Sequence, residues 1–485
     1  IMKKYGLLIL SFLFGLHLNA QDDILRLTAT MLGETPIEED LQELCDGIGG
    51  RVTGSATNEA AVEWALKRFR DAGVNARKQP FDMPVLWLEK ATTASITGSA
   101  TFTPSLVAKY QSPPGKYTGA LVYVGPGTEA DFKNAGSVVR GNFVLIQNDL
   151  CFDINGLFAE YAAAAAAETV AMKYGAKGIV FMSSRPKKLL YRFITSKATE
   201  NNMPQLVLSR EDANRCIRIL ENNGRLNISI NIDAEVGGKF SSSNVIGEIA
   251  GSEKPEEVII IGAHIDSWAL GTGANDNGCN VSMMIDIARQ MQKLGIRPKR
   301  TIRFALWNGE EQGYFGSLAY TKEYEKDMDK HIMALSVDIG SGAITGFFTN
   351  GRKELVSVVD EVLKPVAALG EFTQLNVPIV GTDNFDFMLQ GVGNLVANHL
   401  PVNYGQNYHA ASDTYDKVDL KSLKRNSAII AALTLGFANL EDSQINWKQQ
   451  SRAEIQSMFE EHKLEFTMRM FNVWESWMSK ARGRE

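Results

Sequence analysis

Apolar runs alternate with amphipathic segments along the second half of the chain. The run at residues 258–263 (VIIIGA) is apolar at almost every position, which is typical of a strand buried on both faces. Strands of this kind are predicted at residues 245–249, 258–263, 302–306, 332–337 and 395–398. Helices are predicted at residues 280–294, 316–324, 355–369 and 420–440, and Pro365 is expected to kink or shorten the third. The alternation predicts an α/β fold with a mostly parallel central sheet flanked by helices.

Residues 93–236 have a different texture, with short alternating strands separated by Gly and Pro turns. Within them, residues 160–174 (EYAAAAAAETVAMKY) have a composition that strongly favours a helix. The pattern predicts a compact β-rich insert with a helix on one side. Because this insert contains no histidine and no clustered carboxylates, no chemistry is assigned to it. Residues 237–243, rich in Gly and Ser, predict a polar joint to the α/β region.

At 485 residues the chain is too long for one simple core, so two or three domains are expected. Its tail is charged and helical with scattered aromatic residues, which fits either an extra helix packed on the domain surface or a homodimer contact. The predicted boundaries are a signal peptide at residues 1–20, the N-terminal part of the α/β domain at 21–92, the insert at 93–236, the main part of the α/β domain at 237–441, and a helical C-terminal extension at 442–485.

The first twenty residues are typical of a targeting segment. Lys3 and Lys4 precede an apolar stretch at residues 7–18, and residues 18–20 (LNA) resemble a cleavage site. Cleavage is expected before Gln21, with export to the periplasm or the extracellular medium. A membrane anchor is the alternative, but the run is short for a bilayer span. No later run reaches the roughly 18 apolar residues of a span, so no membrane association is expected after cleavage.

Charge and cysteine content narrow the classes of function. The formal net charge is −6, with 50 basic and 56 acidic residues intermixed, so nucleic-acid binding has no electrostatic support. The four cysteines show no spacing typical of a metal site. In an exported protein they could form disulfides or remain buried thiols, and the sequence leaves both open. They are Cys45, Cys151, Cys216 and Cys279.

Side chains that bind metals follow three of the predicted strands. His264, the pair Glu310 and Glu311, and Asp338 each come directly after a strand. Ligands of parallel sheets bind beyond the carboxyl ends of the strands. Imidazole nitrogen and carboxylate oxygen are zinc ligands. Any one of these residues alone is more often a surface carboxylate or a cap, but three strand ends on one side of a sheet predict a metal site.

The residues around these strand ends allow roles to be proposed. Asp276 lies twelve residues after His264, at the end of a Gly-rich loop, and could bridge two metal ions about 3.5–4 Å apart. Because Glu310 and Glu311 are consecutive, their side chains point in different directions. One can coordinate metal while the other acts as a general base. Asp266 is expected to accept the imidazole N–H of His264 and so to fix its tautomer.

Several motifs carry a resemblance to a known family. They are GGRVTGS at residues 49–55, NVIGE at 244–248, HIDSW at 264–268, GANDNG at 273–278 and LWNGEEQG at 306–313. The sequence resembles the co-catalytic di-zinc aminopeptidases of metallopeptidase family twenty-eight, and within them the carboxypeptidase Q branch. The resemblance covers nearly all of the chain after residue 20 except the C-terminal extension. The insert resembles the protease-associated domain of that family.

Carried onto this sequence, the family pattern implies a site for two Zn²⁺ ions. The implied ligands are a bridging Asp276, with His264 and Asp338 on one ion and Glu311 and His409 on the other. Glu310 is then the base. His409 is taken from the motif YHAASDT at residues 408–414, in which the histidine stands four residues before Asp-Thr. His399, at the end of a predicted strand, is its one rival.

The resemblance implies an exported zinc-dependent exopeptidase that hydrolyses short peptides, dipeptides above all, from a free N-terminus by a metal-bound hydroxide. Two other classes remain as alternatives. One is a catalytically silent, peptidase-like binding protein, which the complete set of implied ligands argues against. The other is a glutaminyl-cyclase-like acyltransferase, which has a single zinc and no insert. Ala269 and Asn384 depart from residues that many relatives of the branch carry, which leaves the substrate preference open.

Overall fold

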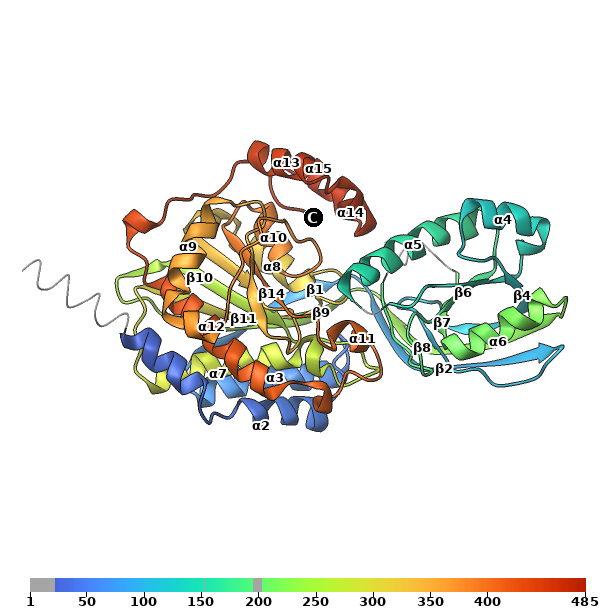
Figure 1. Cartoon of the computed structure of the whole chain (residues 1–485), viewed down its shortest axis with the longest axis horizontal. Helices are drawn as coiled ribbons and strands as arrows, with labels where there is room; N and C mark the ends of the chain where they lie inside the picture. The colour runs from blue at the N-terminus through green and yellow to red at the C-terminus, as the bar shows by residue number, and fades with distance from the viewer. Residues whose placement is uncertain (1–21, 152, 195–202) are drawn as a thin grey trace, which may run out of the picture.

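The chain is built around two seven-stranded sheets, each flanked by helices (Figure 1). This computed structural model describes residues 22–151, 153–194 and 203–485. The predicted signal peptide lies outside the described residues. The larger part of the molecule contains the predicted α/β region, and the smaller part contains the insert.

The larger sheet has the strand order β1-β9-β11-β10-β12-β14-β13. Its strands are β1 Asn75–Met83, β9 Phe240–Ile249, β10 Lys254–His264, β11 Arg300–Trp307, β12 His331–Ser336, β13 Ile344–Phe348 and β14 Asn394–His399. The four central strands are parallel, but β1, β9 and β13 are added by antiparallel pairing, so the expected mostly parallel sheet is wrong for half of the pairings. Helices cross over between β10, β11 and β12, whereas β9 and β10 are joined by a short turn that reverses the chain direction.

Helices cover both faces of this sheet. One face is covered by five helices, which are α2 Ile37–Gln42, α3 Ala56–Asp71, α7 Cys279–Lys293, α9 Glu354–Val362 and α12 Leu420–Ala438. The opposite face is covered by α8 Phe315–Glu323 and α10 Asn384–Leu389. In β10, Ile259 and Ile261 join the first core, while Val258 and Ile260 join the second. Burial on both sides explains the nearly continuous apolar run. The helix expected to be interrupted by Pro365 ends at Val362, before a separate helical turn.

The smaller sheet has the order β2-β8-β4-β5-β6-β7-β3. Its strands are β2 Leu86–Gly98, β3 Leu106–Ala108, β4 Gly115–Tyr123, β5 Phe143–Ile146, β6 Gly178–Met182, β7 Gln205–Leu208 and β8 Leu226–Gly237. Helix α6 (Arg210–Glu221) packs on one face, and α4 (Glu129–Ala135) and α5 (Ile154–Lys173) pack on the other. The expected single helical side is therefore wrong, since the short repeated strands did not reveal helix α6, which joins β7 to β8 on the second face.

The predicted polar joint at residues 237–243 is largely a strand. Only residues 238–239 separate β8 from β9, and Ser241 to Ser243 pair with β1. Only residues 84–85 separate β1 from β2. Two strand connections therefore link the sheets, and the Gly/Ser composition marked the polar start of β9 and not a flexible linker.

The C-terminal extension packs against its own domain. Helices α13 Arg452–Glu461, α14 Glu465–Met470 and α15 Trp474–Ser479 share an apolar core with α10. Arg484 forms a buried bidentate ion pair with Asp386 on α10, with N–O distances of 2.7 and 2.9 Å. This agrees with the interpretation of the tail as extra helical packing on the domain surface.

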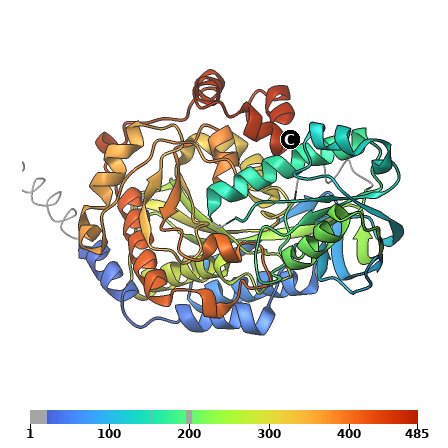
Figure 2. The same ribbon diagram turned by 45° about the vertical axis from the view of Figure 1, so that its right-hand side comes forward.

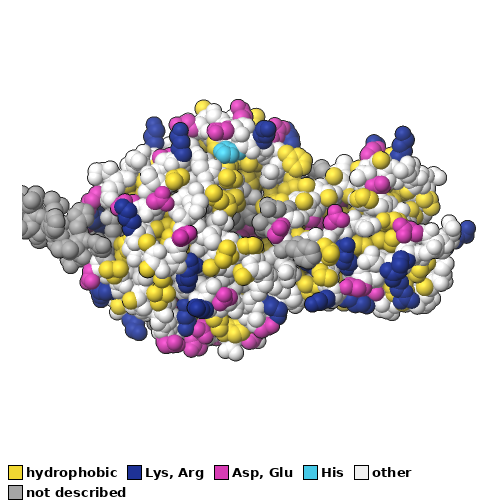
Figure 3. Space-filling view, in the orientation of Figure 1, with side chains coloured by type: hydrophobic (Ala, Val, Ile, Leu, Met, Phe, Trp, Pro, Cys, Tyr) yellow, Lys and Arg dark blue, Asp and Glu magenta, His cyan; other side chains and the backbone are white. Residues whose placement is uncertain are grey.

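Two further features concern the surface and the thiols. Among the residues that the structure describes, no helix combines the length and the apolar character needed to cross a bilayer. On the face drawn in Figure 3, Lys and Arg side chains lie among Asp and Glu side chains. All four cysteines are buried and free. The sequence left disulfides and buried thiols open, and the structure contains buried thiols.

Candidate metal centre

The ends of three neighbouring strands bring the predicted metal-binding side chains together. His264 is the last residue of β10, Glu310 and Glu311 follow β11, and Asp338 follows β12. Because β11, β10 and β12 are adjacent parallel strands, their carboxyl ends meet at one edge of the sheet. His409 lies outside these strands, in the segment that follows the short helix α11 (Tyr404–Asn407).

Within the described residues, two groups of possible metal ligands share Asp276. In the first, His264 Nε2 lies 3.1 Å from Asp276 Oδ1 and 3.5 Å from Asp338 Oδ1. In the second, His409 Nε2 lies 3.2 Å from Asp276 Oδ2 and 2.9 Å from Glu311 Oε2. Asp276 therefore turns one carboxylate oxygen towards each group, which is the arrangement expected of a bridging ligand.

The rival histidine lies elsewhere. His399 Nδ1 is 2.8 Å from the main-chain oxygen of Leu400, and His399 belongs to neither ligand group of the described residues. The motif context therefore selected the histidine that the fold brings to the site. Strand position alone would have favoured His399.

The donor set fits zinc. Each group offers one imidazole nitrogen and two carboxylate oxygens, which are the atom types that zinc binds in hydrolytic sites. Glu311 Oε1 is buried and has no hydrogen-bond partner in the part of the chain that the structure describes. Buried polar atoms are normally paired, so an unpaired carboxylate oxygen beside two other ligands indicates a place for a cation.

The site residues shift one another's pKa values. Burial disfavours the charged imidazole of His409, yet the neighbouring carboxylates of Glu311 and Asp276 raise its pKa to about 9. Burial raises the pKa of Glu311 to about 7, and His409 opposes that rise. Although burial acts the other way, hydrogen bonds from His264 and His409 lower the pKa of Asp276 below its ordinary value. Perturbed pKa values of this kind cluster at functional sites.

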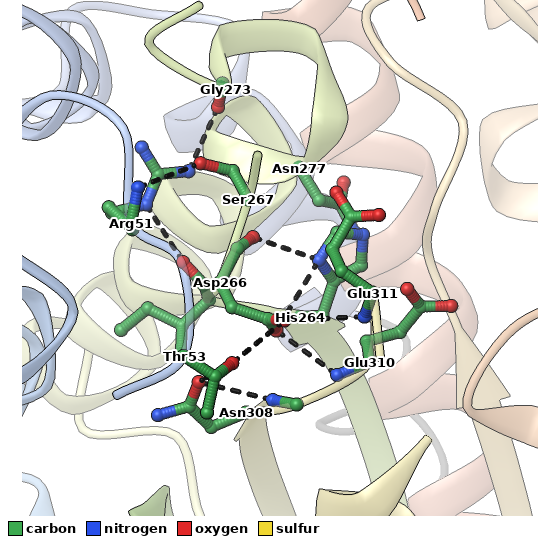
Figure 4. A network of polar contacts seen from close by, with 12 residues as sticks. Arg51, Thr53, His264, Asp266, Ser267, Gly273, Asn277, Asn308, Glu310 and Glu311 are labelled. Atoms are coloured by element: carbon green, nitrogen blue, oxygen red, sulfur yellow. Dashed lines mark hydrogen bonds and ion pairs between the residues drawn. The ribbon is translucent and has the colours of Figure 1, made fainter. Parts of the chain in front are cut away.

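Glu310 stands beside the ligand groups without belonging to either. Its side chain is only 8% exposed, and burial raises its pKa well above the usual range for a carboxyl group. Figure 4 shows the carboxyl groups of Glu310 and Glu311 apart from each other, as expected for consecutive residues leaving a strand. The position of Glu310 is that of a group able to exchange a proton with a molecule held at the site.

Asp266 has a different role from the one predicted. The main-chain oxygen of Asp266, and not its carboxylate, lies 3.0 Å from His264 Nδ1, while the nearer carboxylate oxygen is 3.8 Å away. The carboxylate instead accepts the main-chain N–H groups of Glu310 and Glu311, each at 3.2 Å, and the hydroxyl of Thr53 at 3.1 Å (Figure 4). Asp266 therefore positions the glutamate pair and does not touch the ligand atoms.

Arg51 was part of a matching motif to which the sequence assigned no function. It is fully buried and lies beneath the loop that joins His264 to Asp276 (Figure 4). Its guanidinium donates to four main-chain oxygens at 2.6–3.0 Å, those of Gly49, Ile265, Thr272 and Gly273. Arg51 thus ties the start of the chain to the loop between two predicted ligands.

Asp413 was also missed, although it stands in the motif that identified His409. Its carboxylate accepts the main-chain N–H groups of Asn275 at 2.8 Å and Asp276 at 3.1 Å. Burial raises the pKa of Asp413 to about 7, and these N–H groups oppose the rise. Asp413 therefore holds the backbone of the bridging residue, and the Asp-Thr of the motif was the available signal.

The fold is mixed α/β, and histidine and carboxylate groups meet at the ends of its central strands. Residues 244–434 match the model described as peptidase family M28. This match, together with the similarity of most of the chain to carboxypeptidase Q and to an M28 peptidase structure, supports a peptidase of family M28 near the carboxypeptidase Q branch.

Particular relatives agree with this assignment. Carboxypeptidase Q of Rattus norvegicus is 24% identical over 417 residues, which cover 83% of this chain and 85% of that protein. The probable lipoprotein aminopeptidase LpqL of Mycobacterium tuberculosis is 23% identical and covers 83% of each chain. The peptidase M28 precursor of Shewanella amazonensis has a crystal structure with a TM-score of 0.77, 26% identity, and coverage of 87% of this chain and 97% of that chain. A zinc aminopeptidase from Bacillus subtilis, 19% identical, shares the fold with a TM-score of 0.64 over 82% of this chain and 93% of its own.

Proposed function

We propose that this peptidase is an exported, zinc-dependent exopeptidase that removes residues from the free N-terminus of short peptides, dipeptides included. The observation that carries the proposal is the pair of ligand groups sharing Asp276, with Glu310 beside them. Relatives carry the names of both carboxypeptidases and aminopeptidases. Action at a free N-terminus is therefore our choice between them.

We infer that the site takes two Zn²⁺ ions, one for each ligand group. When bound, zinc acts as a Lewis acid towards a carbonyl oxygen and lowers the pKa of bound water. Glu310 takes the proton of the attacking water and returns it to the nitrogen of the leaving amine. Asp266 and Asp413 keep the backbone of the glutamate pair and of Asp276 in place during these transfers.

The surrounding units fit the same proposal. We assign the insert to the protease-associated type, on its position between β1 and β9 and its own sheet. Export rests on the targeting pattern of residues 1–20. The proposed partner is the peptide substrate, and neither nucleic acid nor a membrane is part of the proposal.

Replacement of the base tests the reaction. We expect Glu310→Gln to retain its zinc and to lose about 10²–10⁴-fold in kcat, because an amide cannot accept the proton. The matched control is Glu323→Gln, at an exposed position of α8, which should keep full activity. Zinc content by elemental analysis and dipeptide hydrolysis are measured on the same samples. Full activity of Glu310→Gln would refute the assignment of the base.

The alternatives are separated by two measurements on the unaltered protein. A dipeptide library is assayed with and without a chelator, and hydrolysis that a chelator abolishes and zinc restores is expected. Well under one zinc per chain, with no hydrolysis, would favour a peptidase-like binding protein. Cyclisation of a peptide with N-terminal glutamine, without hydrolysis, would favour an acyltransferase.

A further inference from the structure

The segment that carries His409 is attached to the insert. The main-chain N–H of Arg192 donates to the oxygen of His409 at 3.0 Å, and the N–H of Ala411 donates to the oxygen of Leu190 at 3.0 Å. These two bonds form a short antiparallel bridge centred on Tyr191 and Ala410. The insert side of the bridge lies outside the region matched by the family model, which begins at residue 244.

A side chain of the insert also reaches the ring of His409. Helix α5 extends from the smaller part of the molecule towards the strand ends of the larger sheet (Figures 1 and 2). From this helix, the hydroxyl of Tyr161 lies 3.5 Å from His409 Nδ1. The ring of Tyr161 stacks on Phe193 with centroids 5.1 Å apart and planes 18° apart, and Phe193 stacks in turn on Tyr191. The stack fixes the direction in which the hydroxyl points.

The two histidines of the site are therefore held in different ways. His264 Nδ1 contacts the main-chain oxygen of Asp266, only two residues along the same strand end. His409 Nδ1 faces Tyr161, which is 248 positions away in the sequence and belongs to helix α5, on the smaller sheet. In both rings Nε2 faces the carboxylates. A histidine that binds metal through Nε2 keeps a proton on Nδ1, and the acceptor of that proton orients the ring.

We propose that Tyr161 is a positioning residue for His409, so that the insert completes the ligand group of Asp276, Glu311 and His409. The group of His264, Asp276 and Asp338 needs no residue of the insert. Metal affinity at one site thus depends on the insert, while affinity at the other does not. The inference rests on the proposed function, because it concerns how the two proposed zinc sites are held.

The test compares stepwise zinc binding to the metal-free full chain and to Tyr161→Phe. Phenylalanine keeps the ring stacked on Phe193 and removes only the hydroxyl. Loss of such an outer contact weakens metal binding by about 10–100-fold, and the 3.5 Å separation places the expected effect near 10-fold. Because His409 belongs to one ligand group only, one binding step should weaken and the other should stay unchanged.

The matched control is Tyr174→Phe, at the other end of α5. Its hydroxyl contacts Glu129 at 3.0 Å, so the control also loses one hydrogen bond, on the same helix but away from the site. It should leave both binding steps unchanged. For Tyr161→Phe, the zinc concentration giving half-maximal hydrolysis should rise about 10-fold, with most of kcat recovered at saturating zinc.

The outcomes separate this inference from the proposed function. If the unaltered protein binds two zinc ions and hydrolyses dipeptides, but Tyr161→Phe binds both equally well, the inference alone is overturned. It is also overturned if both steps weaken together, or if Tyr174→Phe has the same effect. If the unaltered protein binds fewer than two zinc ions, or does not hydrolyse peptides, the proposed function fails first.

Discussion

Replacing Asp266 by asparagine removes a charge and almost no volume, at a position with no exposed surface. The carboxylate has two oxygens, which accept the N–H groups of Glu310 and Glu311 separately. An asparagine has one oxygen and one amino group. It can accept only one of the two N–H groups, and its own N–H₂ faces the other.

The size of the effect follows from this count. A hydrogen bond to a charged acceptor contributes about 1.5–3 kcal/mol, and a buried N–H left without a partner costs about 1–3 kcal/mol. Together these terms predict that Asp266→Asn lowers the free energy of unfolding by about 2.5–6 kcal/mol. Because the lost bond holds the Glu310–Glu311 turn, we also expect kcat or zinc affinity to fall about 10–100-fold.

The assay combines urea unfolding of the metal-free protein with dipeptide hydrolysis at saturating zinc. The matched control is Asp212→Asn in the insert, a buried aspartate that accepts the N–H of Ser105 at 2.9 Å and the hydroxyl of Ser209 at 2.8 Å. It should lose stability without losing kcat. Unchanged stability of Asp266→Asn would refute the hydrogen-bond account. Lost stability with full kcat and full zinc affinity would refute the positioning role.

Two further predictions concern regions away from the site. Arg484→Ala leaves the carboxylate of Asp386 buried without its ion-pair partner, so it should lower the free energy of unfolding by about 3–5 kcal/mol. Adding Asp386→Asn should recover part of this loss in urea unfolding. A loss below about 1 kcal/mol, as for an exposed ion pair, would contradict the prediction. His331 is held neutral between the hydroxyl of Tyr320 and the oxygen of Asp327, and burial lowers its pKa to about 4. The difference between this pKa and the unfolded value of about 6.5 corresponds to about 3 kcal/mol of pH-dependent folding stability. This stability should be fully present above about pH 6.5 and be lost as the pH falls towards 4. Unfolding free energies at pH 7 and pH 4.5 should differ more for the unaltered protein than for His331→Gln, and equal differences would exclude this role.

Much of the central fold could be predicted because its cause is local. The nearly continuous apolar runs of β10 and β11 indicate strands that are buried on both faces. In the intervening α7, apolar residues recur every three or four positions, as in a helix. The direction of the edge strands could not be predicted. An apolar run does not reveal its neighbour, so β13 was missed and the antiparallel edges were not foreseen.

The sequence by itself determined the types of ligand and their places at the strand ends. His264, Glu310, Glu311 and Asp338 follow strands that their own composition forms, and parallel neighbours bring such ends together. His409 came from a motif and not from its position along a strand.

Only the tertiary structure decided which groups hold these ligands. Arg51 and Tyr161 each contact a residue more than 200 positions away in the sequence. The carboxylate of Asp266 accepts a main-chain N–H of the segment that follows another strand, β11. The physical reason is that periodicity and strand ends are properties of neighbouring residues. A hydrogen bond between remote segments depends on how those segments pack, and the spacing of residues along the chain carries no record of it.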